Sequence, residues 1–186
     1  MNQKIDIRDI SLKGERIILR PWNYNDLDDL YEYAKMDDCS SRAGWMKVKN
    51  LDTAKFFLGH FVEDHDTFAI EYQNKVIGNL SIHRYPEILY PKLNRYLGTE
   101  IGFVLNKDYW GQAIMKEAID LVIDYLFKDL QIDFILASHF LDNQQSARVL
   151  NKCGFKVLNK EILAADRVIN KNLLNYILVN PLKKND

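Results

Sequence analysis

The chain has 186 residues, 47% of them hydrophobic, which is enough to bury one good core, so a single domain over residues 1–186 is expected. Its 25 basic and 26 acidic residues nearly cancel. This balance argues against a nucleic-acid-binding protein and favours a small molecule or another protein as the partner.

The two cysteines, Cys39 and Cys153, lie far apart in the sequence and form no Cys-x-x-Cys pair. Neither a disulfide framework nor a metal site is therefore expected, and reduced thiols in the cytoplasm are the simplest interpretation. The N-terminal segment lacks the apolar core of a signal peptide, and no run has the roughly 18 apolar residues of a membrane span. We expect no membrane partner.

The first half of the chain predicts one strand, two helices and a β-hairpin, in this order. Ile17–Pro21 is a short run of residues that favour β-structure and ends in proline, which predicts a strand. Asn25–Ala34 has its apolar residues on one helical face, which predicts a helix. Asp52–Phe61 predicts another helix with an acidic residue capping its start. A β-hairpin is expected next, with strands over Phe68–Tyr72 and Val76–His83 and a turn at Gln73–Lys75.

The second half predicts four strands and two helices. Apolar residues at helical spacing predict a long helix over Trp110–Lys128. A shorter helix over Asn143–Cys153 is expected to stop at Gly154, because glycine readily ends a helix. The strands are expected over Tyr96–Leu105, Phe134–Ser138, Phe155–Leu158 and Leu173–Val179.

The most informative segment is Glu100–Ile119, which predicts a strand, a tight loop containing Gly111 and an amphipathic helix. The start of a helix leaves backbone N–H groups unpaired and has the positive end of the helix dipole, so such a loop can hold a pyrophosphate without a basic side chain. A second segment, Asp142–Ser146, opens another helix that runs into Leu150–Phe155. The alternative for the loop is an ordinary strand-loop-helix connection in which Gly111 serves packing.

Four motifs in this order resemble the GCN5-related N-acetyltransferase (GNAT) superfamily, and most closely its RimJ/RimL type. They are Leu12-Lys-Gly-Glu-Arg-Ile-Ile-Leu-Arg-Pro21, Glu100-Ile-Gly-Phe-Val-Leu105, Tyr109-Trp-Gly111 and the Asn-x-x-Ser-x-Arg-Val-Leu-x-Lys-x-Gly-Phe pattern from Asn143 to Phe155. The resemblance covers nearly the whole chain. It implies an α/β fold with a strongly bent mixed β-sheet of six to seven strands flanked by about four helices, and acetyl-CoA as co-substrate.

The resemblance also implies which residues bind acetyl-CoA. The family's pyrophosphate cradle aligns with Trp110, Gly111, Gln112, Ala113, Ile114 and Met115, and its pantetheine-binding strand edge aligns with the backbone of Phe103, Val104 and Leu105. Ala113 replaces the central glycine of the family pattern, which costs little at negative φ but is penalised at positive φ. Asn143 matches an asparagine that hydrogen-bonds the cofactor arm, although it could instead cap its helix.

The family tyrosine that protonates the leaving thiolate has no counterpart, because Leu150 stands at its position. The resemblance leaves Ser146 as the candidate for hydrogen-bonding the thiolate and Glu100 as the candidate for relaying the proton of the amine, unless Glu100 is only a half-exposed strand residue. His83 and His139 could titrate near neutrality, but histidines in the core or at its rim are more common. The identity of the general base is left open.

These expectations describe an acyltransferase that moves an acetyl group from acetyl-CoA to a primary amine by direct transfer. The acceptor is a protein N-terminal amine, as on a ribosomal protein, or a small molecule. Neither metal nor nucleic acid is expected, and a homodimer is possible. The alternative is a non-catalytic sensor or interaction module that binds CoA or another ligand, which Ala113 and Leu150 motivate.

Overall fold

The computed structural model describes residues 2–39, 48–158 and 173–183. Four α-helices lie wholly within these residues, α1 Leu27–Ala34, α3 Leu51–Asp64, α4 Ile114–Asp124 and α5 Gln144–Lys152. The strands are β1 Leu12–Lys13, β2 Ile17–Pro21, β3 Thr67–Tyr72, β4 Lys75–His83, β5 Gly98–Leu105, β6 Phe134–Phe140, β7 Lys156–Val157 and β8 Leu173–Val179. The predicted α/β class is confirmed.

The eight strands follow the order β1-β2-β3-β4-β5-β6-β8-β7. β5 and β6 are parallel, whereas β1–β2, β2–β3, β3–β4, β6–β8 and β7–β8 are antiparallel, so the sheet is mixed as predicted. The predicted six to seven strands fall short of the observed number, because β1 has only two residues and lacks a recognisable alternating pattern. No helix in the described ranges is long and apolar enough to cross a membrane.

The chain divides into two compact units. The first unit comprises Ile5–Ser81 and Phe103–Leu121, and the second comprises Met1–Lys4, Ile82–Gly102 and Val122–Asp186. β5 contributes residues to both, since Gly102 ends one segment of the second unit and Phe103 begins one of the first. The expectation of a single domain stays a prediction.

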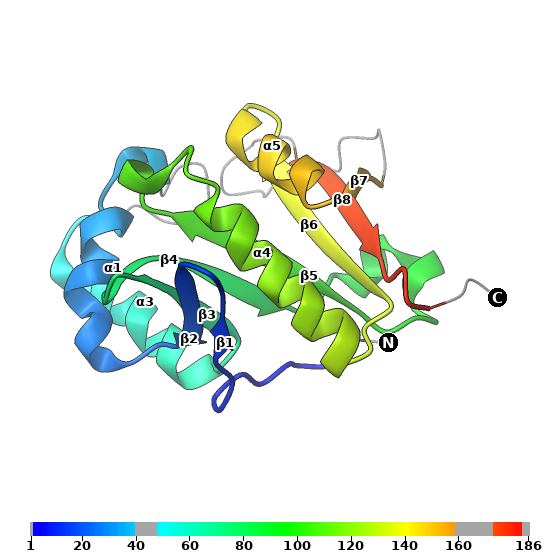
Figure 1. Ribbon diagram of the computed structural model, residues 1–186, viewed down its shortest axis with the longest axis horizontal. Coiled ribbons are helices and arrows are strands. Elements are labelled where there is room, and N and C mark those ends of the chain that lie inside the picture. Colours follow the sequence, from blue (N-terminus) through cyan, green and yellow to red (C-terminus); the bar gives the residue numbers. More distant parts are fainter. Residues whose placement is uncertain (1, 40–47, 159–172, 184–186) are drawn as a thin grey trace. The chain divides into compact units, whose positions relative to one another are not determined.

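The first unit has its own hydrophobic core, to which α1 and α3, neighbours in Figure 1, both contribute. Leu30 of α1 and Leu58 of α3 are fully buried there, as is Ala69 of β3. The cap of α3 differs from the prediction: Asn50 is the N-cap and accepts a hydrogen bond from the Thr53 backbone N–H (2.9 Å), while Asp52 lies in the first turn. The helix therefore starts one residue earlier than expected.

The predicted β3–β4 hairpin is confirmed, with a tighter turn than expected. Tyr72 and Lys75 are register partners, so only Gln73 and Asn74 form the turn. Their φ angles are 51° and 61°, the left-handed values that a two-residue turn needs to match the twist of its strands. Lys75 belongs to β4 and forms an ion pair with Glu32 of α1 (2.7 Å).

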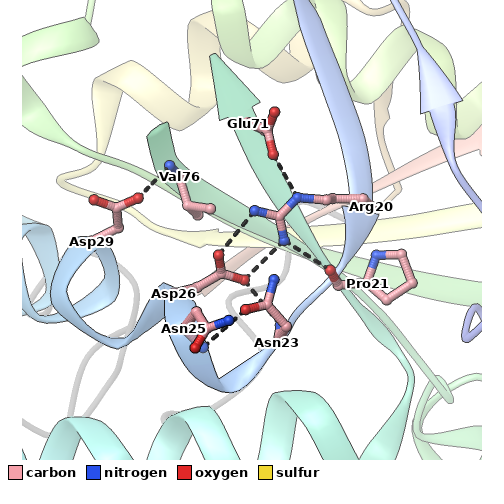
Figure 2. A network of polar contacts seen from close by, with 8 residues as sticks. All are labelled: Arg20, Pro21, Asn23, Asn25, Asp26, Asp29, Glu71 and Val76. Carbon is pink, nitrogen blue, oxygen red and sulfur yellow. Dashed lines mark hydrogen bonds and ion pairs between the residues drawn. The ribbon is translucent and has the colours of Figure 1, made fainter. Parts of the chain in front are cut away.

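A network of charged residues joins β2, β3 and the start of α1 in the first unit (Figure 2). The Arg20 guanidinium donates to both carboxylate oxygens of Asp26 (2.8 and 2.9 Å) and to Glu71 (2.6 Å). Asp26 also accepts a hydrogen bond from the Asn23 backbone N–H. The Asn23 side chain accepts one from the Asn25 backbone N–H, so Asn23 caps the 3-10 turn before α1. The carboxylates raise the pKa of Arg20 through these hydrogen bonds, against its partial burial.

The second unit is built on β6 and β8, which lie side by side in Figure 1. Phe134 of β6 packs over Gly98 of β5, where an added Cβ would stand 2.0 Å from the Phe134 ring. Tyr85 stacks edge-on against the same ring with 5.1 Å between centroids. Together with Leu136 these side chains form the core of this unit.

Candidate functional site

The predicted site residues divide between the two units. The first unit contains the predicted cradle and strand edge, and the second contains Glu100, Asn143 and Ser146.

The loop between β5 and α4 is held by its own side chains in the first unit. Asn106 is buried, donates its backbone N–H to the Ile77 carbonyl (2.8 Å) and accepts the Asp108 N–H at its side chain (3.0 Å). The Trp110 indole N–H donates to the Leu105 carbonyl (2.9 Å), which the Cys39 thiol also approaches (3.5 Å). Trp110 therefore braces the loop, and the Leu105 carbonyl, predicted to meet the pantetheine arm, already has partners.

The helix after this loop begins at Ile114, so its predicted start at Trp110 was wrong. Gly111 has φ of 80° and Ala113 has φ of 60°, and both left-handed values are incompatible with a right-handed helix. The first helical bond is donated by the Glu117 N–H to the Ala113 carbonyl (3.1 Å). The helix also ends earlier than expected, because Tyr125–Asp129 forms a π-helical turn.

The loop conformation leaves a run of backbone donors unpaired. Among the described residues, no acceptor takes the N–H groups of Gly111, Gln112, Ala113, Ile114 or Met115. Nothing lies within 4 Å of the point where a Cβ would stand on Gly111. Consecutive free N–H groups at the positive end of a helix favour an anion, which is the chemistry that a pyrophosphate needs.

Ala113 occupies a strained position, since an alanine at φ of 60° lies in the region that favours glycine. We expect Ala113→Gly to raise the free energy of unfolding by about 0.5–1 kcal/mol, which is the left-handed penalty less the extra entropy that glycine loses. Thermal unfolding of the two proteins measures the difference. Ala118→Gly in the helix interior is the control and should lower the stability by about 1 kcal/mol or more; a lower melting temperature for Ala113→Gly would contradict the assignment.

Arg16 holds the loop and the first turn of α4 together. Its guanidinium donates to Glu117 Oε2 (2.8 Å) and to the Gln112 carbonyl (2.9 Å), and its backbone N–H donates to Glu117 Oε1 (2.8 Å). Partial burial raises the pKa of Glu117, but the hydrogen bonds from Arg16 outweigh it and leave the pKa below its usual value. Gly14 makes room for this contact, because an added Cβ would stand 2.5 Å from Glu117 Oε1.

Sequence reasoning missed this role of Arg16. The signal was present, since Arg16 lies in the opening motif Leu12–Pro21, but nothing in a single sequence pairs it with Glu117, 101 residues away. The pair matters because an ionised Glu117 in the first turn would compete with an anion at the free N–H groups. Arg16 balances that charge while its bond to the Gln112 carbonyl fixes the loop.

In the second unit, Glu100 lies on β5 with its side chain half-buried. The Ser138 hydroxyl of β6 donates to Glu100 Oε1 (3.3 Å). Burial raises the pKa of the Glu100 carboxyl, and His83 and the Ser138 hydrogen bond only partly offset this. A carboxylate with a raised pKa is a stronger base than an ordinary one, so Glu100 is suited to accept a proton when it is ionised.

His83 and Tyr90 flank this carboxylate. His83 is exposed, and its ring lies beside Gly102 of β5: a Cβ added to Gly102 would stand 3.9 Å from the ring, which is an ordinary van der Waals contact. Tyr90 packs against the core of the second unit, and burial followed by the charge of Glu100 raises its pKa. Neither residue was given a firm role from the sequence.

Asn143 lies at the start of α5. Its side chain accepts the Ser146 backbone N–H (3.1 Å), so Asn143 is the N-cap. The helix ends as predicted at Gly154 (φ of 88°), where the Gly154 N–H bonds the Asn151 carbonyl and the Phe155 N–H bonds the Leu150 carbonyl. Leu150 is fully buried, so the position of the family tyrosine has a packing role.

His139 makes structural contacts. It is buried, its Nδ1 lies 2.7 Å from the Phe140 carbonyl, and its Nε2 lies 3.3 Å from the Tyr176 hydroxyl. The carbonyl can only accept, so Nδ1 carries the proton of this hydrogen bond. His139 is therefore a core histidine, which is the more common of the two roles considered from the sequence.

Comparison with known proteins places the chain in a family. The family model described as "Acetyltransferase (GNAT) domain" matches residues 16–156. A Bacillus subtilis (strain 168) protein named "Probable N-acetyltransferase YjcK" is 30% identical over 170 residues, covering 84% of this chain and 88% of its own length. Another, "Uncharacterized N-acetyltransferase YoaA", is 24% identical over 159 residues, covering 78% and 82% of the two chains.

Solved structures show the same fold. A GNAT-family acetyltransferase from Bacillus anthracis superposes with a TM-score of 0.79 at 20% identity, over 92% of this chain and 99% of the other. The ribosomal-protein-S5-alanine acetyltransferase from Vibrio fischeri gives a TM-score of 0.70 at 23% identity, over 95% and 100%. The chain therefore belongs to the GNAT acetyltransferase family and is an acyltransferase of the N-acetyltransferase class.

Proposed function

We propose that the co-substrate is acetyl-CoA and that the N–H groups of Gly111–Met115 bind its pyrophosphate. The single observation that supports this most is the run of five backbone donors without acceptors in the described residues, at the start of α4. The site fits the group, since the donors are consecutive and the space beside Gly111 is open. The backbone of Phe103 and Val104 would meet the pantetheine amides, as in β-strand addition.

Acetyl-CoA supplies a thioester whose carbonyl carbon an uncharged amine attacks, so that a C–N bond forms and the C–S bond breaks. We assign to Glu100 the role of taking the proton lost by the ammonium, through a water molecule, because burial raises the pKa of its carboxyl and makes it a stronger base. The Ser146 hydroxyl, which has no hydrogen-bond partner among the described residues, is assigned to the leaving sulfur. Asn143 positions Ser146 through the cap, and its predicted contact with the cofactor stays a prediction.

The acceptor is a primary amine, either a protein N-terminus or a small molecule. The Vibrio fischeri relative is described as acting on a ribosomal protein, which supports the first of these by fold alone. The non-catalytic alternative loses weight, because the family model and the curated relatives are acetyltransferases. A cytoplasmic location and a homodimer stay predictions.

The experiment is a transfer assay in which release of the CoA thiol and acetylation of the amine are followed together. Wild type is expected to release one thiol per acetylated amine, and Ser146→Ala to lower kcat by about 10-fold with little change in the KM of acetyl-CoA. Thiol release that is independent of any amine would contradict direct transfer. Full activity in Ser146→Ala would remove Ser146 from the mechanism.

Arg16→Met tests the cradle itself. Loss of two charge-assisted hydrogen bonds leaves Glu117 unbalanced beside the free N–H groups, so we expect the KM of acetyl-CoA to rise about 10-fold. S-acetylpantetheine has no pyrophosphate, and its kcat/KM should stay within about twofold of wild type. Lys13→Met, an exposed change on β1, is the control; equal losses with both thioesters would show that Arg16 acts elsewhere.

A further inference from the structure

A row of polar side chains crosses three neighbouring strands of the second unit. Glu100 lies on β5, Ser138 on β6 and Asn175 on β8. Ser138 and Asn175 are register partners, and Glu100 is the partner of Leu136, two residues before Ser138. Residues in register, and those two apart on a strand, share one face of a sheet, so the three polar side chains lie on the same face.

Asn175 is the unexplained member of this row. Asn175 is 7% exposed, and its Nδ2 is buried without a hydrogen-bond partner among the described residues. Leaving such a donor unsatisfied costs about 1–3 kcal/mol, so native structures rarely keep one without a use. Its neighbours do not explain it, because Leu136 and Ile177 on the same face belong to the apolar core of this unit.

The fixed bonds around Asn175 leave its amide available. The backbone carbonyl of Asn175 accepts the Leu158 N–H (3.0 Å), and the hydroxyl of Ser138 is directed to Glu100. Among the described residues, no lysine or arginine forms a hydrogen bond or an ion pair with Glu100, Ser138 or Asn175. The row therefore offers the Glu100 carboxylate as a base and the Asn175 amide as a neutral hydrogen-bond donor, and Glu100 is its charged member.

We propose that Asn175 is the specificity-determining residue for the acceptor, and that its amide N–H donates to an uncharged carbonyl oxygen close to the reacting amine. This rests on the proposed function, in which Glu100 takes the proton of that amine. An amine whose neighbouring carbon bears a carboxamide has its nitrogen and carbonyl oxygen a few bonds apart, so one molecule can meet both residues. The Glu100 carboxylate disfavours an acceptor carboxylate at the same place.

The experiment compares two amine acceptors of similar shape, one with a carboxamide beside the amine and one without. Alanine amide has the α-amine and the carboxamide, and in 2-amino-3-methylbutane an isopropyl group of similar shape replaces the carboxamide. Asn175→Leu is expected to lower kcat/KM for alanine amide by about 10- to 100-fold, mainly through KM, and to change it less than about threefold for the alkylamine. Comparing variant with wild type for each acceptor separately removes the difference in amine basicity.

Two further variants separate recognition from folding. Asn175→Asp keeps the shape but replaces the donor, so it should lose alanine amide as Asn175→Leu does. Asn175→Leu should melt no lower than wild type, because it removes an unsatisfied buried donor, whereas a structural role for the amide predicts a lower melting temperature. Asn151→Leu, on the exposed side of α5, is the control and should leave both acceptors unaffected.

Each outcome decides the proposal. Equal losses for both acceptors, no loss for either, or failure of wild type to acetylate alanine amide would overturn it. Failure of wild type to bind acetyl-CoA by calorimetry would instead overturn the proposed function, so the two failures are distinguishable.

Discussion

Glu100→Gln is expected to lower kcat for acetyl transfer by about 10²- to 10³-fold, because glutamine keeps the shape and can still accept from Ser138 but cannot take a proton. The KM of acetyl-CoA should change little. Steady-state kinetics with a saturating amine measures the effect. Glu15→Gln, an exposed substitution, is the control.

The same variant should be more stable than wild type at neutral pH. Burial raises the pKa of Glu100 in the folded protein above its value in the unfolded chain, so the folded state binds the proton more tightly. The stability that this gives is complete below the unfolded pKa and is lost as the pH rises through the folded pKa. Above the folded pKa, the wild-type protein must keep an ionised carboxylate partly buried, which costs stability, whereas glutamine stays uncharged. The melting temperature of Glu100→Gln should therefore exceed that of wild type above the folded pKa, and this advantage should vanish below about pH 4.

The pH dependence of catalysis follows from the same group. Glu100 acts as a base only when ionised, so kcat/KM should fall as the pH is lowered through its pKa, which lies above the usual 4.5. A Glu100→Gln enzyme with wild-type kcat and an unchanged acid limb would show that another group is the base. A variant less stable than wild type at pH 7 would show that the carboxylate is structural.

Arg20→Met is expected to lower the free energy of unfolding by about 2–4 kcal/mol. It leaves Asp26 and Glu71 without their shared cation, and the Asp26 side chain is only 8% exposed (Figure 2). The side chains of Arg20 and Glu71 are 23% and 21% exposed, so the expected loss of stability is smaller than for a fully buried ion pair. Urea-induced unfolding measures it through the transition midpoint.

A matched control for this prediction lies elsewhere in the first unit. Arg8 pairs with Asp6 at 2.6 Å, but both side chains are largely exposed, at 59% and 43%. Arg8→Met should therefore shift the stability by less than about 0.5 kcal/mol. Arg20→Met combined with Asp26→Asn and Glu71→Gln should recover part of the loss; equal effects of Arg8→Met and Arg20→Met would contradict the importance of burial.

Most of the fold was predictable because local patterns determine it. β2 and β8 have the predicted bounds, since a proline ends the first and an apolar run defines the second. The start of α4 was missed because Ala113 adopts a left-handed φ that no propensity assigns to alanine. A helix drawn through Gly111 and Ala113 has the same apolar spacing, so periodicity alone could not separate the two.

The site was less predictable because its contacts join residues distant in sequence. Glu100 meets Ser138 only through the parallel register of β5 and β6, and Arg16 meets Glu117 only through tertiary packing. Asn175 had no signal at all, since its importance lies in a buried donor without a partner. Asn143 was recognised, and its hydrogen bond from the Ser146 N–H shows that it caps α5, while its contact with the cofactor stays a prediction.

The central claim, that the free N–H groups at the start of α4 bind the pyrophosphate of acetyl-CoA, is tested most directly by calorimetric titration of acetyl-CoA into the purified protein. ATP is the control, because it has a phosphate chain and adenosine but no pantetheine arm. Binding of acetyl-CoA in about the micromolar range, with ATP at least about tenfold weaker, is the predicted result. No binding of acetyl-CoA, or equal binding of ATP, would contradict the account and leave Ala113 as the mark of a site that no longer serves its family's reaction.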